Sequence, residues 1–164
     1  MKKLYAPWRS QYINRVHTKT EKTSCVFCAI HESQYDAQEF VLKRFEHCMI
    51  ILNKYPYNPG HILIVPYEHY EQLYNYKSTV HTELITQASI ASEILQKTLG
   101  AHGCNVGINI GKAAGAGIPE HLHIHVLPRF IGDTNFLPIL ADTKQISIDL
   151  NEIYTKLLAA YHIF

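Results

Sequence analysis

Apolar and polar positions along this chain predict short strands first, then one long helix, then strands again. Short apolar runs between turn residues are typical of strands, and they occupy residues 40–42, 49–52, 61–66 and 104–110. The run 61–66 has little polar interruption, so we expect that strand to be buried on both faces. From about residue 70 to 99, apolar residues recur every three or four positions, which indicates one helix face against a core.

The two ends of the chain carry different patterns. Residues 1–24 are polar and irregular, so we expect an extended arm that packs through Trp8 and Tyr12. Apolar residues with helical spacing return between 149 and 164, which predicts a C-terminal helix. No repeat or linker divides residues 1–164, so the sequence predicts a single domain of the α+β class with a mostly antiparallel sheet.

Three histidines, His121, His123 and His125, alternate with apolar residues. Strict alternation is typical of a strand, and residues two apart in a strand face the same side. We therefore expect the three imidazoles on one face of a sheet, where their neutral nitrogens are nucleophiles, bases or metal ligands near pH 7. A metal site made of all three is disfavoured, because alternate strand residues lie about 7 Å apart at Cα and no carboxylate completes the set.

A loop of small residues, 111–119, leads directly into the histidine row. Glycines in such a loop, here Gly111, Gly115 and Gly117, let the backbone approach a ligand, and successive N–H groups form an anion-binding hollow. A phosphate site beside imidazoles indicates nucleophilic attack on phosphorus with a phosphohistidine intermediate. The plainer alternative is a loop that only turns the chain.

Charge and composition narrow the choice of partners and location. A net charge of +1 implies no general attraction to nucleic acid or to an anionic membrane. The chain has no apolar stretch of transmembrane length, and the N-terminus lacks the apolar run of a secretory signal, so we expect a cytoplasmic protein. Its four cysteines are then expected to be thiols or metal ligands. Cys25-x-x-Cys28 is either half of a zinc site or a pair of core thiols.

Residues 109–129 resemble the histidine-triad (HIT) superfamily, whose motif is a row of histidines alternating with apolar residues. Residues 121–127 fit that motif at every position, and residues 58–66 are similar to the family's Pro-Gly-His strand. The segment 128–136 is similar to the branch of diadenosine polyphosphate hydrolases and phosphorylases. The resemblance implies a HIT-like fold, with a mostly antiparallel sheet, one long helix and a C-terminal helix.

The resemblance also implies an activity, the cleavage of dinucleoside polyphosphates such as diadenosine tri- or tetraphosphate at the α-phosphorus. His123 would be the nucleophile and carry a nucleotidyl-histidine intermediate. His125 would orient His123 and hold phosphate oxygens, His121 would support the site through its other ring nitrogen, and His61 would bond to the triad. No cofactor is needed for the chemical step. The implied nucleotide-binding residues are Asn53, Asn109, Gly115, Gly117, Phe27 and Ile30.

Two further expectations rest on the resemblance. Some relatives bind a structural zinc through the cysteine pair and two histidines, and the matching residues here are Cys25, Cys28, His69 and His121. The superfamily also implies a homodimer, built from the long helix at about 70–99 and a strand edge. The expected partners are therefore a nucleotide substrate and a second copy of the chain, with neither nucleic acid nor membrane.

One segment departs from the family pattern. Residues 115–120 lack the Gln, Ser or Thr that usually stands before the first histidine of the motif. The spacing from Asn109 to His121 is also about one residue longer than in the hydrolases of the family. The departure leaves open which polyphosphate is cleaved and whether water or inorganic phosphate is the acceptor, although the longer loop favours the phosphorylase-like members. The alternatives are a non-catalytic nucleotide sensor, or a phosphoramidate or nucleoside monophosphate hydrolase of the same fold. Arg129 is either a substrate contact or part of a salt bridge.

Overall fold

The computed structural model describes residues 25–133 and 149–163, so the arm predicted at 1–24, with Trp8 and Tyr12, lies outside the described residues. In chain order the elements are α2 (Val26–Glu32), α3 (Asp36–Glu39), β1 (Val41–Arg44), β2 (Cys48–Leu52), β3 (Ile62–Pro66), η1 (Leu73–Asn75), α4 (Ser78–Leu99), β4 (Gly103–Ile108), η2 (Lys112–Ala114), β5 (Ile124–Arg129) and α6 (Leu150–Ile163).

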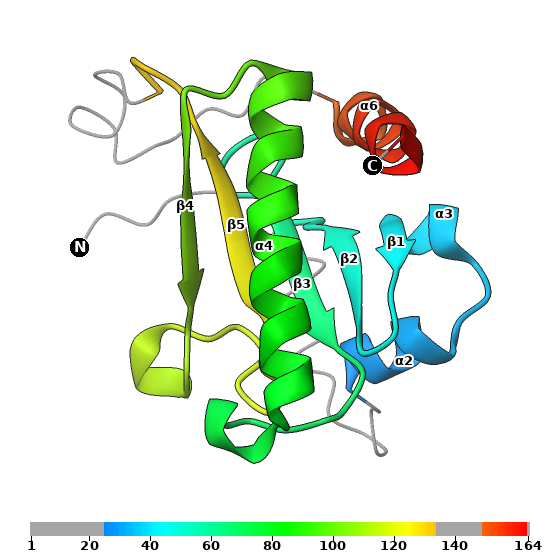
Figure 1. Cartoon of the computed structure of the whole chain (residues 1–164), viewed down its shortest axis with the longest axis vertical. Helices are drawn as coiled ribbons and strands as arrows, with labels where there is room; N and C mark the ends of the chain where they lie inside the picture. The colour runs from blue at the N-terminus through cyan, green and yellow to red at the C-terminus, as the bar shows by residue number, and fades with distance from the viewer. Residues whose placement is uncertain (1–24, 134–148, 164) are drawn as a thin grey trace, which may run out of the picture.

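Five strands form one sheet in the order β1-β2-β3-β5-β4, and every neighbouring pair is antiparallel (Figure 1). The prediction of an α+β fold is thus confirmed. Strands β3 and β5, far apart in the chain, lie side by side with Leu63 opposite His125. On the other side of β5 the edge strand β4 places Gly107 opposite His125. His125 therefore stands on the sheet between a leucine and a residue without a side chain.

Helices α4 and α6 cover one face of the sheet and enclose the main core (Figure 1). The apolar spacing of α4 directs Leu84, Ala91 and Leu95 into this core, as helical periodicity requires. The opposite face carries a smaller core beneath α2, centred on Phe27 and Ile30. Because β3 lies between the two cores, it is buried along its whole length, as its apolar run predicts. Among the described helices, none has the length and apolar character needed to cross a bilayer.

The long helix begins at Ser78, so the prediction of a start near residue 70 was wrong. The preceding segment is held by hydrogen bonds that do not belong to a helix. The buried hydroxyl of Tyr76 lies 2.9 Å from the carbonyl oxygen of Glu68 and accepts the N–H of Tyr70 at 3.3 Å. These bonds satisfy backbone groups outside α4, and they make the segment a separate loop.

Strand β5 begins at Ile124, so the prediction of a strand starting at His121 was also wrong. The ladder between β3 and β5 pairs Ile64 with Ile124, and the same register would continue with Val65 opposite His123 and then Pro66 opposite Leu122. Proline has no N–H to donate, so it ends a ladder. The N–H of Leu122 instead donates to the carbonyl of Tyr70 at 2.9 Å. The residues just before Ile124 therefore lie outside the sheet.

Candidate active site

Four histidines come together on the α2 face of the sheet. His61 precedes β3, His125 lies in β5, and the Nε2 atom of His61 is 2.9 Å from the Nδ1 atom of His125. The ring of His123 is 4.8 Å from that of His125, and Phe27 packs against the rings of both His121 and His123, at 5.4 and 5.1 Å. Three of the four rings, excluding His125, are almost fully buried.

The proton positions on His61 and His125 follow from their partners. The backbone N–H of Tyr57 donates to Nδ1 of His61 at 3.2 Å. The amide nitrogen of Asn53 also lies 3.1 Å from this atom, while its oxygen accepts the N–H of Tyr55, which fixes the orientation of the amide. A neutral imidazole has one donor and one acceptor nitrogen, so His61 carries its proton on Nε2 and donates to Nδ1 of His125.

His125 must then carry its own proton on Nε2. This atom is buried and has no hydrogen-bond partner within the part of the chain that the structure describes. A buried donor without a partner costs about 1–3 kcal/mol of folding free energy, so we expect a bound ligand to accept a hydrogen bond from this N–H. Burial lowers the pKa of His125 to about 4, with a further contribution from His123. At pH 7 the ring is therefore neutral, and its free N–H is the group available to a substrate oxygen.

The proton position on His123 is the reverse of that on His125. Its Nδ1 atom lies 2.9 Å from the carbonyl oxygen of His121, and a carbonyl can only accept, so Nδ1 carries the proton. Burial lowers the pKa of His123, and the ring is neutral near pH 7. Its Nε2 atom therefore holds a lone pair. A neutral imidazole with a fixed lone pair beside a free N–H donor is the arrangement required for attack on phosphorus.

The ring of His121 faces the N-terminal cysteine pair. Its Nε2 atom donates to the carbonyl oxygen of Pro66 at 2.8 Å, so Nδ1 holds the lone pair. That Nδ1 lies 3.3 Å from Sγ of Cys25, 3.7 Å from Sγ of Cys28 and 3.2 Å from Nδ1 of His69. All four ligand atoms lie within 4.8 Å of one another.

These separations fit a tetrahedral zinc ion. Zinc bound to two thiolates and two imidazoles holds its ligand atoms about 3.3–3.8 Å apart, given Zn–S and Zn–N bonds of about 2.3 and 2.0–2.1 Å. The bond from His121 to Pro66 is also the outer contact that metal-bound histidines usually make. The residues Cys25, Cys28, His69 and His121 would hold the ion at the edge of the histidine row.

The residues expected to bind the nucleotide occupy different surroundings. Phe27 and Ile30 are only 3% and 7% exposed, so they form a wall of the smaller core beside the triad. Asn53 is half-buried and its amide is engaged with His61. The other expected residues are Asn109, half-buried just beyond β4, and Gly115 and Gly117, both exposed in the loop that leads to the triad.

Sequence reasoning did not place Tyr57 beside the histidines. Its ring lies 4.8 Å from that of His61 and nearly parallel to that of His125, at 18° and 6.0 Å, yet it is 47% exposed. Its place four residues before His61 was the available signal. Arg129 binds Asp133 through Nε at 2.7 Å, which favours the salt-bridge alternative for this residue.

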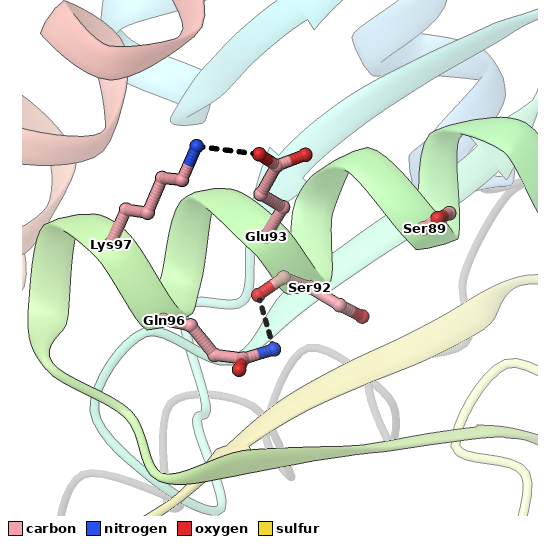
Figure 2. Close-up of a pocket in the computed structure, with 5 residues that line it drawn as sticks. All are labelled: Ser89, Ser92, Glu93, Gln96 and Lys97. Carbon is pink, nitrogen blue, oxygen red and sulfur yellow. Dashed lines mark hydrogen bonds and ion pairs between the residues drawn. The ribbon is translucent and has the colours of Figure 1, made fainter.

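A shallow depression on α4 lies away from this site (Figure 2). Figure 2 shows Lys97 reaching the carboxylate of Glu93, at 2.6 Å, and Gln96 donating to the carbonyl of Ser92. The histidines lie on the opposite face of the sheet from α4, so this depression has no part in their chemistry.

Acid should destabilise the fold through His61 and His125. Burial, helped by the neighbouring histidines, lowers the pKa of His61 to about 3 and that of His125 to about 4, against about 6.5 in an unfolded chain. Between these values the unfolded chain binds more protons, so the free energy of unfolding should fall as the pH falls below about 6.5. Each histidine contributes up to about 1.4 kcal/mol per pH unit.

Urea unfolding at about pH 7.5 and about pH 5 measures this effect. A His61→Gln variant should show a smaller loss of stability on acidification than the parent protein. Equal losses in the two proteins would mean that His61 is not the neutral, buried group described above.

Comparison with known proteins identifies the family of this chain. The sequence model of the HIT domain family matches residues 34–132, which is more than half of the chain. The chain belongs to the HIT family. The AP-4-A phosphorylase of Mycobacterium tuberculosis is 34% identical over 151 residues, covering 89% of this chain and 77% of that protein. The asymmetrical bis(5'-nucleosyl)-tetraphosphatase of Schizosaccharomyces pombe is 28% identical over 100 residues, covering 61% and 54%.

Solved structures of the HIT family share the fold. A Zn-bound histidine triad family protein from Mycobacterium smegmatis superposes with a TM-score of 0.70 at 30% identity, covering 85% of this chain and 94% of that one. Both of these HIT relatives, the phosphorylase and the tetraphosphatase, are enzymes that act on dinucleoside polyphosphates. This supports assigning the chain to the nucleotide hydrolases or transferases.

Proposed function

We propose that this HIT protein cleaves dinucleoside polyphosphates at the α-phosphorus through a nucleotidyl-histidine intermediate on His123. One observation carries the proposal: the Nδ1 proton of His123 is held by the carbonyl of His121, which leaves a lone pair on Nε2. A fixed lone pair removes the need to select one tautomer before attack. The sensor alternative has no such requirement, because binding a nucleotide does not need a nucleophile.

In the first step, Nε2 of His123 attacks the α-phosphorus, a P–N bond forms, and the bond from phosphorus to the bridging oxygen breaks. With diadenosine tetraphosphate the leaving group is ATP. The free Nε2–H of His125 donates to an oxygen of the reacting phosphate and stabilises the negative charge in the transition state. In the second step an acceptor oxygen attacks the same phosphorus and releases His123. Water as acceptor gives AMP, and inorganic phosphate gives ADP.

Inorganic phosphate is the acceptor that we favour. The AP-4-A phosphorylase of Mycobacterium tuberculosis supports it, with 34% identity over 89% of this chain. The spacing from Asn109 to His121 supports it as well, since it is about one residue longer than in the hydrolases. In this proposal, contacts to the nucleotide come from the residues predicted above: Asn53, Asn109, Gly115, Gly117, Phe27 and Ile30.

The products identify the reaction. The protein is incubated with diadenosine tetraphosphate, with and without inorganic phosphate, and the nucleotides are separated by chromatography. ADP and ATP that form only when phosphate is present support a phosphorylase. AMP and ATP without added phosphate would make the protein a hydrolase instead. Saturable binding of the dinucleotide with no ADP, AMP or ATP formed would make the protein a nucleotide sensor. If a parallel incubation with a nucleoside phosphoramidate alone gives cleavage, the protein is a phosphoramidate hydrolase of the same fold.

We also propose a structural zinc at Cys25, Cys28, His69 and His121. Protein purified without chelator should contain about one zinc per chain, and removal of the metal should lower the melting temperature, because structural zinc contributes to folding. A Cys25→Ser variant should lose the metal. Cys104→Ser is the matched control, since this half-buried cysteine lies outside the cluster and should leave the zinc content unchanged. Less than about a tenth of an equivalent in the parent protein would return Cys25 and Cys28 to core thiols.

The expected homodimer remains a proposal, as does a cytoplasmic location. Support for the dimer comes from the edge strand β4 and the neighbouring α4, which expose Val106 and Ile85 at 50% and 62%. An exposed edge strand with apolar residues favours pairing with a second copy. Light scattering at micromolar concentration should give twice the mass of the chain, 18.8 kDa, and the mass of a single chain would remove the proposal.

A further inference from the structure

The carbonyl of His121, which holds the proton of His123, belongs to a peptide group that is bonded on both sides. Its oxygen accepts from Nδ1 of His123 at 2.9 Å. The N–H of the same peptide group is that of Leu122, and it donates to the carbonyl oxygen of Tyr70 at 2.9 Å. A peptide group is planar, so a bond that fixes the direction of its N–H also fixes the direction of its carbonyl. The carbonyl of Tyr70 is therefore the anchor of the group that selects the tautomer of His123.

This anchor lies in a bend between β3 and α4, and the buried side chain of Tyr76 holds the bend in place. The hydroxyl of Tyr76 lies 3.0 Å from the carbonyl oxygen of Tyr70 and 2.9 Å from that of Glu68, and it shares its single proton between them. Its ring is 5% exposed and packs in the main core. In the part of the chain that the structure describes, this hydroxyl and the N–H of Leu122 are the only groups that bond the Tyr70 carbonyl. The hydroxyl therefore ties the bend to the core.

We propose that Tyr76 is a positioning residue for the nucleophile. Its hydroxyl holds the carbonyl of Tyr70, and this carbonyl orients the peptide group between His121 and Leu122. The inference rests on the proposed role of His123 as the nucleophile. A continuous series of hydrogen bonds, each of 2.9 or 3.0 Å, connects the main core with the reacting ring. In this role Tyr76 touches no substrate, and it acts by keeping the proton of His123 on Nδ1.

The sheet does not hold this peptide group. In the register of β3 and β5, Leu122 would stand opposite Pro66, and proline has no N–H to donate. The ring of His121 is fixed by the carbonyl oxygen of Pro66 at 2.8 Å. That contact leaves the torsion about the Cα–C bond of His121 free, and rotation about this bond turns the carbonyl while the ring stays in place. The bond from Leu122 to Tyr70 is the one that restrains this rotation.

The bend also carries His69, one of the four residues proposed to bind zinc. His69 stands between Glu68 and Tyr70, whose backbone groups meet the hydroxyl of Tyr76. A zinc ion would hold the ring of His69, whereas the hydroxyl holds the backbone on either side of it. The two influences on the bend are separable, because one depends on the metal content and the other on a single oxygen atom of Tyr76.

Replacing Tyr76 by phenylalanine removes that oxygen and keeps the buried ring. The carbonyl of Tyr70 then loses its bond to the core, and the N–H of Leu122 loses a fixed acceptor. In the second neutral tautomer of His123 the proton sits on Nε2, which then has no lone pair for attack on phosphorus. The variant should therefore bind the dinucleotide and turn it over more slowly.

The test compares Tyr76→Phe with Tyr154→Phe in the full chain supplied with zinc. Tyr154 is the matched control, because it is also buried, and its hydroxyl donates to the carbonyl of Val41 at 3.0 Å from α6, on the other face of the sheet. Both variants lose one bonded hydroxyl, so urea unfolding should show similar losses of stability. With diadenosine tetraphosphate, kcat should fall about tenfold in Tyr76→Phe and less than about twofold in Tyr154→Phe. KM should change less than about twofold in both variants.

Two signals in NMR spectra report the positioning directly. In Tyr76→Phe the ¹⁵N signals of the His123 ring should change from one tautomer to a mixture, because the carbonyl that accepts its proton is no longer fixed. The amide of Leu122 should exchange with solvent about tenfold faster or more, since its acceptor has lost its support. Both signals should be unchanged in Tyr154→Phe.

The inference requires kcat and both NMR signals to change together in Tyr76→Phe. No change, a change in kcat alone, or a change in the NMR signals alone would overturn it. An equal fall in kcat for Tyr154→Phe would also overturn it, as would a fall that tracks a loss of zinc, which is measured in each protein. If the parent protein cleaves no dinucleotide at all, the proposed function fails, and the NMR signals still decide whether Tyr76 positions His123.

Discussion

Replacing His123 by alanine should lower kcat for a dinucleoside polyphosphate by about three orders of magnitude or more. The substitution removes the nitrogen that forms the P–N bond, and water cannot adopt the same fixed lone pair, so the covalent route is lost. A loss of this size corresponds to about 4 kcal/mol of transition-state stabilisation. Binding of the nucleotide should survive, because the residues proposed to bind it do not include His123.

Steady-state kinetics and titration calorimetry measure the two effects separately. His162→Ala is the matched control, because this histidine is exposed on α6, on the other face of the sheet. It should leave both kcat and the dissociation constant unchanged. A His123→Ala enzyme that keeps more than about a tenth of the parental rate would remove His123 from the role of nucleophile, since that loss is below about 1.4 kcal/mol.

Replacing Gly60 by alanine should cost about 3 kcal/mol of the free energy of unfolding. Gly60 has a positive φ of 88°, which costs an L residue about 1–2 kcal/mol. A Cβ at this position would lie 2.5 Å from Cδ1 of Leu99 and 3.3 Å from Cδ2 of Leu95. The end of the half-buried Leu99 side chain must turn away, and the fully buried Leu95 must give by a few tenths of an ångström. Overpacking of this kind costs about 1–3 kcal/mol more.

The chain offers a control for the backbone part of this cost. Gly100 also has a positive φ, 67°, but a Cβ there would meet nothing within 4 Å. Gly100→Ala should therefore cost only about 1 kcal/mol. Urea unfolding of the two variants gives the comparison. Equal losses would mean that the contact between Gly60 and α4 adds nothing, and that conformation alone explains why glycine stands before His61.

Much of the fold could be predicted from the sequence, because the spacing of apolar residues reflects both the type of element and the face that it buries. The uninterrupted run at 61–66 indicated β3, and the alternating histidines indicated a shared face for three rings. The starts of α4 and β5 could not be predicted in the same way. The first depends on where the hydroxyl of Tyr76 bonds, and the second on Pro66 lying opposite Leu122 in the register. The first is a bond from a side chain to a backbone group eight residues away, and the second is a pairing between segments far apart in the chain, so neither shows in the apolar pattern.

The proton positions in the candidate site lie further beyond sequence reasoning. They depend on backbone groups: the N–H of Tyr57 and the carbonyls of Pro66 and His121. Every residue has a backbone carbonyl, and every residue except proline has a backbone N–H. The residue types in a sequence therefore do not show which of these groups will form a hydrogen bond with a histidine. The motif could show that histidines are present and adjacent, but only the fold assigns a lone pair to His123 and a free N–H to His125.

The residue at position 107 determines how much space lies beside His125. Residues directly opposite each other in an antiparallel pair carry their side chains on the same face, and Gly107 stands opposite His125. A Cβ at 107 would enter open space, and the backbone there has no positive φ, so larger residues fit the strand without strain. Each added carbon would narrow the approach to the N–H of His125 from the edge of the sheet. A single position on β4 can therefore set the width of the approach to His125 while leaving all four histidines in place.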